Sequence, residues 1–278
     1  MFNSKCGCLI AIFLFFANAG TVVAQSYDVI IRNGRILDGT GNPWFEGDVG
    51  IHGNLISVIG DLGDAVATRE VDATGLYVTP GFIDTHSHAG PGLRTEVLSE
   101  GRPLLAQGIT TVLINPDGGG MVDLKDQKEQ LMHHGIGVNV IQLVPHGSIR
   151  RSVMGAEDRI PTNSEMSQML DLVKNGMGEG AFGLSSGTFY VPGSYSEPSE
   201  IEAMAKIVAQ YKGIYTSHIR DESNYTVGLI RSVEEVINVA RNVGLPAVVT
   251  HVKALGPPVW GYAAAVVRKI EAAREEGL

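Results

Sequence analysis

From residue 81 onward, short apolar segments alternate with longer segments of helical pattern. The apolar segments cover residues 82–83, 110–114, 138–144, 181–184, 214–217 and 247–250. The helical patterns cover residues 97–107, 124–133, 164–173, 198–211, 226–243 and 262–276. Strands and helices in strict alternation are typical of βα units, which form a parallel sheet with helical crossovers. The pattern therefore predicts an α/β fold from residue 81 to residue 278.

Polar residues at the ends of the expected strands favour a barrel over an open sheet. An open doubly wound sheet binds its ligand at one switch point. A (β/α)8 barrel instead collects side chains from the ends of all its strands on one face. Here such residues follow strand after strand: His86, His88, Asp117, His146, His218 and His251.

The number of βα units falls short of a complete barrel. We count about six units, whereas a closed barrel of this type has eight strands. The sequence ends after an expected helix, where another strand would begin. We therefore expect residues 81–278 to form a barrel domain that is truncated in this chain.

Two different segments precede the expected barrel. Residues 25–80 contain short strands separated by glycine turns such as Asn33-Gly34, which predicts a small β-sandwich segment. Residues 1–24 combine Lys5, an apolar run over residues 8–16 and a stretch of small residues. This layout predicts a cleaved signal peptide, with an uncleaved anchor as the alternative. We expect an exported protein, periplasmic or secreted, without stable membrane insertion after cleavage.

Charge and cysteine content exclude several classes of function. The net charge is −9, and no cluster of lysine and arginine is present, which argues against a nucleic-acid partner. The two cysteines, Cys6 and Cys8, both lie in the expected signal peptide. A disulfide framework and a cysteine nucleophile are therefore not expected.

Four histidines have the placement of metal ligands. His86 and His88 are two residues apart, so in a strand both side chains point to the same side. Two imidazoles at this spacing form a metal clamp, while the alternative is a pair of hydrogen-bonded core histidines. His218 and His251 end two consecutive strands, and we expect both to join the same site.

Two other polar features are less informative. Residues 183–187 fit the G-x-S-x-G pattern, but Thr188 to Pro192 is not a helix start, so a nucleophile elbow is not expected. His146 ends the third strand and is interpreted as structural or as a support for other ligands.

The combination of motifs resembles the amidohydrolase superfamily, and within it the N-acyl-D-amino-acid deacylase (D-aminoacylase) branch. The superfamily resemblance rests on the His86/His88 pair and on the single histidines that close later strands. The branch resemblance rests on the segments at 107–111, 180–187, 190–193, 218–220 and 251–253. It extends from about Tyr27 to the end of the chain.

The resemblance implies a zinc centre of one or two ions. Well-known members have a bridging cysteine where the second strand ends, and Asp117 lies at that position here. A carboxylate is able to bridge two zinc ions. The alternative is that Asp117 only forms a turn or caps a helix. The resemblance also assigns binding of a substrate carboxylate to Tyr190 and Lys253, with loop packing and a surface lysine as the alternatives.

The implied activity is hydrolysis of the amide bond of N-acyl-D-amino acids, by a zinc-dependent amidohydrolase acting on non-peptide C–N bonds. The family's general base is an aspartate of the eighth strand, expected beyond Leu278, so the 278 residues alone are expected to be inactive. The alternatives are a cyclic-amide or dipeptide hydrolase, and a catalytically inactive homologue that acts as a binding protein. The acyl group, the amino-acid side chain and the oligomeric state stay open.

Overall fold

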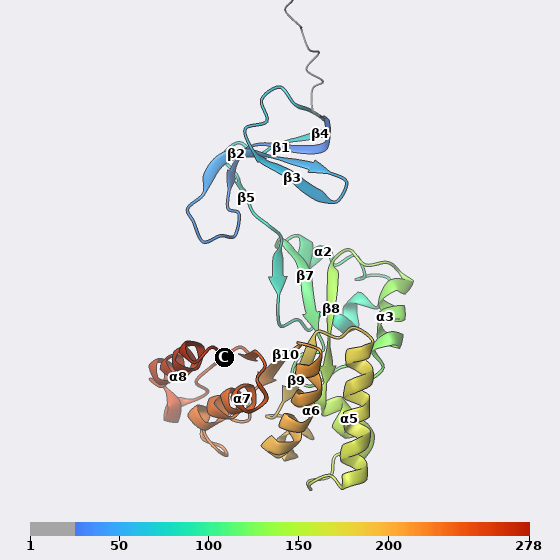
Figure 1. Cartoon of the computed structure of the whole chain (residues 1–278), viewed down its shortest axis with the longest axis vertical. Coiled ribbons are helices and arrows are strands. Elements are labelled where there is room, and N and C mark those ends of the chain that lie inside the picture. The colour runs from blue at the N-terminus through green and yellow to red at the C-terminus, as the bar shows by residue number, and fades with distance from the viewer. Residues whose placement is uncertain (1–25) are drawn as a thin grey trace, which may run out of the picture. The chain divides into compact units, whose positions relative to one another are not determined.

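The computed structural model describes residues 26–278, so the expected signal peptide lies outside the described residues. The chain divides into two compact units, one up to Pro80 and one from Gly81 to Leu278 (Figure 1).

The described part of the first unit is a single five-stranded sheet. Its strands are β1 (Ser26–Ile36), β2 (Phe45–His52), β3 (Leu55–Gly60), β4 (Val66–Asp72) and β5 (Tyr77–Val78). The order is β3-β2-β1-β4, and β5 also pairs with β1. Two residues of β1, Tyr27 and Ile30, are among the buried apolar side chains. The sequence predicted a β-sandwich segment in this part of the chain. In the structure, residues 26–80 form a single sheet.

The second unit contains a parallel sheet whose strands follow the order of the chain. In residues 81–278 these are β6 (Phe82–Asp84), β7 (Ile109–Ile114), β8 (Asn139–Pro145), β9 (Gly183–Gly187), β10 (Ile214–His218) and β11 (Ala247–Val249). Each strand pairs in parallel with the next, in the order β11-β10-β9-β8-β7-β6. This is a partial parallel barrel, and the predicted α/β class is confirmed.

Helices connect these strands, as Figure 1 shows for α5, α6 and α7 beside β9 and β10. The longer helices are α3 (Leu124–His133), α4 (His146–Met154), α5 (Asn163–Gly178), α6 (Pro198–Gln210), α7 (Leu229–Val243) and α8 (Ala263–Glu275). The short ones are α1 (Gly90–Leu93), α2 (Arg102–Leu105) and the 3₁₀ turns η1 (Gly193–Tyr195) and η2 (Pro257–Val259).

One helix prediction was wrong, and one helix was missed. The helix expected over residues 97–107 is reduced to α2, because Gly101 adopts a left-handed conformation (φ 60°) and Pro103 can only begin a helix. Helix α4 was not expected, since it starts directly after β8 without a loop.

The main core of the second unit lies between the sheet and α5, α6 and α7. Met169, Ile201, Met204 and Val233 are fully buried there together with Leu184 of β9. Helix α5 begins with a capping box between Thr162 and Glu165, in which each side chain accepts a hydrogen bond from the other residue's backbone N–H. These helices hold β9 and β10 in place, and the ends of both strands lead into the candidate site.

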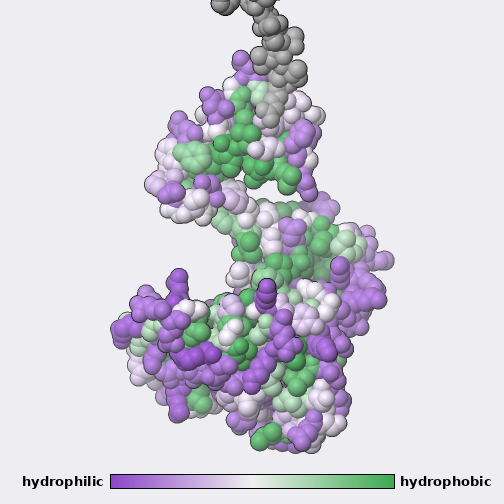
Figure 2. Space-filling model, in the orientation of Figure 1, coloured by the Kyte–Doolittle hydropathy of each residue, from purple (hydrophilic) through white to green (hydrophobic). Residues whose placement is uncertain are grey.

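The strands at the two ends of this sheet carry exposed apolar side chains. Phe82 and Ile83 of β6 and Val248 of β11 are exposed. Hydrophobic residues reach the surface in patches between hydrophilic ones (Figure 2). Within residues 26–278, no helix has the length and apolar character needed to cross a membrane.

Candidate metal centre

His86 and His88 lie in the segment that follows β6, not inside the strand. The backbone N–H of Ser87 donates to the Leu113 carbonyl (2.9 Å), which ties this segment to β7. Both histidines face the Asp117 carboxylate: the Nε2 atoms lie 3.4 Å (His86) and 3.2 Å (His88) from its Oδ2. The side chain of His86 is mostly buried, and that of His88 is exposed.

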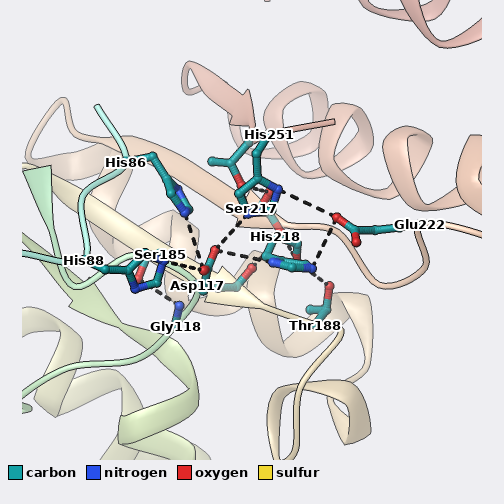
Figure 3. Close-up of polar contacts among 12 residues, drawn as sticks. His86, His88, Asp117, Gly118, Ser185, Thr188, Ser217, His218, Glu222 and His251 are labelled. Carbon is teal, nitrogen blue, oxygen red and sulfur yellow. Dashed lines mark hydrogen bonds and ion pairs between the residues drawn. The ribbon is translucent and has the colours of Figure 1, made fainter. Parts of the chain in front are cut away.

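Asp117 lies at the centre of the site, in the loop that follows β7 (Figure 3). Its backbone has φ 54°, a region that residues with a side chain rarely adopt, and Gly118 follows with φ 70°. This sharp bend needs support from neighbouring residues, because such a conformation costs about 1–3 kcal/mol.

Ser185 of β9 supplies that support. Its hydroxyl donates to the carbonyl of Asn115 (2.5 Å) and accepts from the N–H of Gly118 (3.2 Å). On the other side of the loop, the N–H of Ser148 donates to the Gly118 carbonyl (2.9 Å). Ser185 therefore binds the backbone on both sides of Asp117.

His218 and His251 approach the same carboxylate from the ends of β10 and β11. The His218 Nδ1 atom lies 3.6 Å and the His251 Nε2 atom 3.4 Å from Asp117 Oδ1. The two strand ends are joined because the Thr250 side chain donates to the Ser217 carbonyl (2.8 Å). The structure thus brings all four histidines and Asp117 together.

Glu222 is a site residue that the sequence pattern did not reveal. Its Oε1 atom lies 3.4 Å from His218 Nε2 and 3.7 Å from His251 Nδ1, and its side chain is buried. Glu222 follows a strand-end histidine by four residues, in a segment without helical or strand periodicity. The signal in the sequence that could have revealed Glu222 was an acidic residue so soon after the end of a strand.

The donor atoms have the spacing of ligands around zinc. Zinc binds nitrogen and oxygen at about 2.0–2.2 Å in a tetrahedron, which places neighbouring ligand atoms about 3.4 Å apart. The N···O distances here are 3.2–3.7 Å. The possible ligands form two groups that share His251. In one group His251 lies with His86 and Asp117, and in the other with His218 and Glu222.

Several of these atoms have no other partner. His86 Nε2, Asp117 Oδ1 and both ring nitrogens of His218 are buried without a hydrogen bond. Buried polar atoms are rarely left unsatisfied, because each costs about 1–3 kcal/mol. The donor set therefore fits one metal ion or two.

The electrostatics of the cluster favour the ligand forms of its side chains. Burial opposes ionisation of Asp117, but the contacts with His218 and His86 lower its pKa well below the usual range. Burial, together with the charge of Lys253, lowers the pKa of His251. A carboxylate and a neutral imidazole are the forms that bind metal.

The two predicted substrate-binding residues lie beside the cluster. The Tyr190 ring centroid is 4.6 Å from that of His218. Burial raises the pKa of Tyr190, and the charges of Asp117 and Glu222 raise it further. The Lys253 ammonium group forms an ion pair with Glu222 and lies 3.1 Å from His251 Nδ1. A cation and a phenol therefore border the metal ligands, and their contact with a substrate carboxylate stays a prediction.

A cavity of about 680 Å³ opens beside Asp117 and His88. The segments that follow β6, β7, β8 and β9 form its wall, and Tyr190 lines it as well. Its position next to the expected ligands gives a small molecule room to reach the cluster.

His146 lies in a separate buried cluster. Its Nε2 atom is 2.8 Å from Glu200 Oε1, and Arg150 forms an ion pair with the same carboxylate. All three side chains are buried. They join α4 to α6, in agreement with the structural interpretation of His146.

Comparison with known proteins places the chain among relatives of the same architecture. It is 32% identical to the D-aminoacylase of Alcaligenes xylosoxydans xylosoxydans, over 90% of this chain and 55% of that protein. It superimposes on N-acyl-D-glutamate deacylase from Bordetella bronchiseptica, solved with zinc and a phosphonate inhibitor that mimics the tetrahedral intermediate. That match has a TM-score of 0.82 and 32% identity, over 91% of this chain and 57% of the other.

A D-aminoacylase structure described as having a binuclear metal centre gives a TM-score of 0.83 and 29% identity, over 90% of this chain and 56% of that one. The chain spans about half the length of the curated relatives that it matches. The profile described as "Amidohydrolase family" matches residues 69–258. The fold, the motifs and this match agree, and the chain belongs to the amidohydrolase family.

Proposed function

We propose that the protein is a zinc-dependent hydrolase of the amide bond in N-acyl-D-amino acids. The observation that carries the proposal is the set of unpaired histidine and carboxylate atoms around Asp117, at the spacing of zinc ligands. Its similarity to D-aminoacylase and to N-acyl-D-glutamate deacylase supports the choice of substrate.

Four histidines and Asp117 would hold the metal. His86 and His88 lie on one side of Asp117, and His218 and His251 on the other (Figure 3). A zinc ion at this place would polarise the substrate carbonyl and lower the pKa of the attacking water. With two carboxylate oxygens facing different histidines, Asp117 is suited to bridge two ions.

Lys253 and Tyr190 would bind the carboxylate of the amino acid. The Lys253 ammonium group lies beside His251, so an anion bound there would be close to the metal. Glu222 is buried and paired with Lys253, which fixes the position of the ammonium group. The general base stays a prediction outside the described residues.

The proposal is tested by a substrate panel on the natural protein that contains these residues. The zinc-loaded protein is expected to hydrolyse N-acetyl-D-amino acids and to spare their L-enantiomers, cyclic amides and dipeptides. Removal of zinc with a chelator abolishes turnover, and added zinc restores it. Hydrolysis of cyclic amides or dipeptides alone would contradict the proposal, as would a folded, zinc-loaded protein without hydrolase activity.

Lys253→Met separates carboxylate binding from chemistry. This variant is expected to raise KM for N-acetyl-D-amino acids by roughly 10-fold or more, because charge-assisted hydrogen bonds contribute about 1.5–3 kcal/mol. The KM for the corresponding amides, which lack the carboxylate, would change little. Equal losses on both substrates would mean that Lys253 has another role.

Export to the periplasm or the medium is a further part of the proposal. It rests on residues 1–24 alone. Mass spectrometry of the mature protein is expected to find an N-terminus near Gln25, and an intact Met1 would contradict cleavage.

A further inference from the structure

Two arginines line the cavity beside Asp117, and neither has a carboxylate partner among residues 26–278. Arg94 follows α1 and is partly buried; its Nη1 donates to Gln130 Oε1 (2.8 Å) and approaches Met121 Sδ (2.8 Å). Arg151 of α4 donates from Nη2 to the carbonyl of Val191 (2.8 Å). These acceptors are all neutral, so both guanidinium charges remain uncompensated.

The rest of the cavity wall carries a single negative charge. Asp117 is the one acidic residue of the lining, and it faces the four histidines of the metal centre. Ser87, His88 and Tyr190 of the wall belong to the site itself. The remaining polar side chains are neutral amides and a hydroxyl, namely Asn115, Gln127 and Ser148. A carboxylate beside Arg94 and Arg151 would therefore meet two cations, and the one acidic group of the lining is engaged with histidines.

The position of the cavity indicates which part of the substrate carries this carboxylate. This step rests on the proposed function. The cavity is formed after β6 to β9, whereas Lys253 follows β11 and does not line it. Tyr190 borders both halves, because it lines the cavity and its ring also lies against His218, which is outside the lining. The acyl group and the amino-acid half leave the scissile carbonyl in opposite directions. With the amino-acid carboxylate at Lys253, the acyl group extends into the cavity.

We propose that Arg94 and Arg151 form an anion subsite for the acyl group, so that the preferred substrates carry a second carboxylate at the end of that group. A succinyl or glutaryl amide of a D-amino acid has this chemistry. A guanidinium binds a carboxylate through parallel N–H···O bonds and contributes specificity as well as affinity.

The test compares two acyl groups on the same D-amino acid in the natural protein. The wild type is expected to show a higher kcat/KM for the N-succinyl than for the N-butanoyl substrate, which has the same chain length without the charge. Arg94→Met and Arg151→Met are each expected to lower kcat/KM for the succinyl substrate by roughly 10-fold, and to change the butanoyl value by less than about 2-fold.

Two further variants control for general damage. Arg102→Met removes an exposed arginine of α2 that pairs with Glu100 and does not line the cavity, so it should leave both substrates unaffected. Arg94→Lys keeps the charge and should retain part of the succinyl preference. Arg151 is exposed, so Arg151→Met keeps the test valid even if Arg94→Met fails to fold.

Several results would overturn the subsite. One is a wild type without preference for the succinyl group. Another is an equal loss of kcat/KM on both substrates in Arg94→Met and Arg151→Met. A third is a selective loss on N-acetyl-D-glutamate in these variants, which would place the second carboxylate in the amino-acid half. If the zinc-loaded protein hydrolyses no N-acyl-D-amino acid, the proposed function fails by itself. Calorimetry with glutarate against butyrate then decides the subsite: tighter glutarate binding that is lost in Arg151→Met supports it, and equal binding of the two acids contradicts it.

Discussion

The second unit holds two clusters in which histidines meet carboxylates, and they differ in how their polar atoms are satisfied. In the α4–α6 cluster, His146 and Glu200 are 2.8 Å apart and Arg150 compensates the carboxylate. Around Asp117 the corresponding distances are 3.2–3.6 Å, and neither ring nitrogen of His218 has a hydrogen bond. In the first cluster the carboxylate is engaged by His146 and Arg150, whereas the second leaves space and lone pairs for an ion.

The difference shows that proximity of histidine and acid does not identify a metal site. His146 also keeps one unpaired ring nitrogen, Nδ1, but its other nitrogen and the Glu200 carboxylate are engaged. At the Asp117 cluster, donors from several strand ends converge on one carboxylate. Substitutions in the two clusters should therefore have opposite consequences for metal content and for stability.

The largest effect is expected from Asp117→Asn. The change keeps the shape of the side chain but removes the negative charge between the histidines. Loss of a residue that only supports a metal ligand lowers metal affinity by roughly 10–100-fold. Loss of the Asp117 charge should lower it by more than this, and turnover should become undetectable. Zinc titration and a thermal melt of the metal-free protein measure both properties. Unchanged zinc affinity would mean that Asp117 forms a turn and does not bind the metal.

Glu200→Gln should affect stability and spare the metal. Without the carboxylate charge, Arg150 is left buried and unpaired, which costs about 3–5 kcal/mol. Denaturant unfolding should record this loss in the free energy of unfolding, while the folded fraction keeps its full zinc content. A variant with normal stability and reduced zinc would erase the distinction between the clusters.

A smaller effect is expected from the support of the Asp117 loop. Ser185→Ala removes the two contacts that Ser185 makes with the backbone around Asp117, and should weaken zinc binding by roughly 10-fold, as loss of an outer support does. Ser186→Ala is the matched control. Ser186 is an equally buried neighbour that instead contacts Tyr215 (2.7 Å) and Ser217 (2.9 Å). Equal zinc affinities in the two variants would exclude a positioning role for Ser185.

The smallest effect concerns the pH dependence of stability. Burial raises the pKa of Tyr215 from 10.0 to about 12, despite its hydrogen bonds with Ser186 and Ser217. A raised pKa means that folding favours the neutral phenol, so this contribution is complete below pH 10 and is lost as the pH rises towards 12. Tyr215→Phe should cost about 1 kcal/mol at neutral pH and flatten the decline between about pH 10 and 12. An unchanged alkaline slope would show that other groups control it.

The sequence predicted the architecture and most of the candidate cluster because both follow from strand ends. Parallel strands end on the same edge, so the alternation of strands and helices was enough to place His86, His88, His218 and His251 together. Asp117 was also placed at a strand end, but its role as a metal ligand came from the resemblance, and its left-handed backbone could not be foreseen from the sequence. The structure brings all five residues to one centre.

What could not be predicted from the sequence depends on irregular segments. Glu222 reaches the cluster from a stretch without periodicity, and its pairing with Lys253 depends on how two such stretches fold beside each other. Helix α4 begins without a loop, so the Glu200 cluster that it forms with α6 was invisible as well. The cavity with Arg94 and Arg151 likewise draws on four different strand-end segments.

Zinc X-ray absorption on the purified natural protein, combined with elemental analysis, tests the central claim most directly. We predict one or two zinc ions per chain, bound by nitrogen and oxygen at about 2.0–2.2 Å, with no sulfur ligand. Within the 278 residues no cysteine follows Cys8, so Asp117 is the expected ligand where well-known relatives have a thiolate. Absence of stoichiometric metal, a sulfur neighbour at about 2.3 Å, or full zinc content in His218→Ala would contradict the proposed zinc centre.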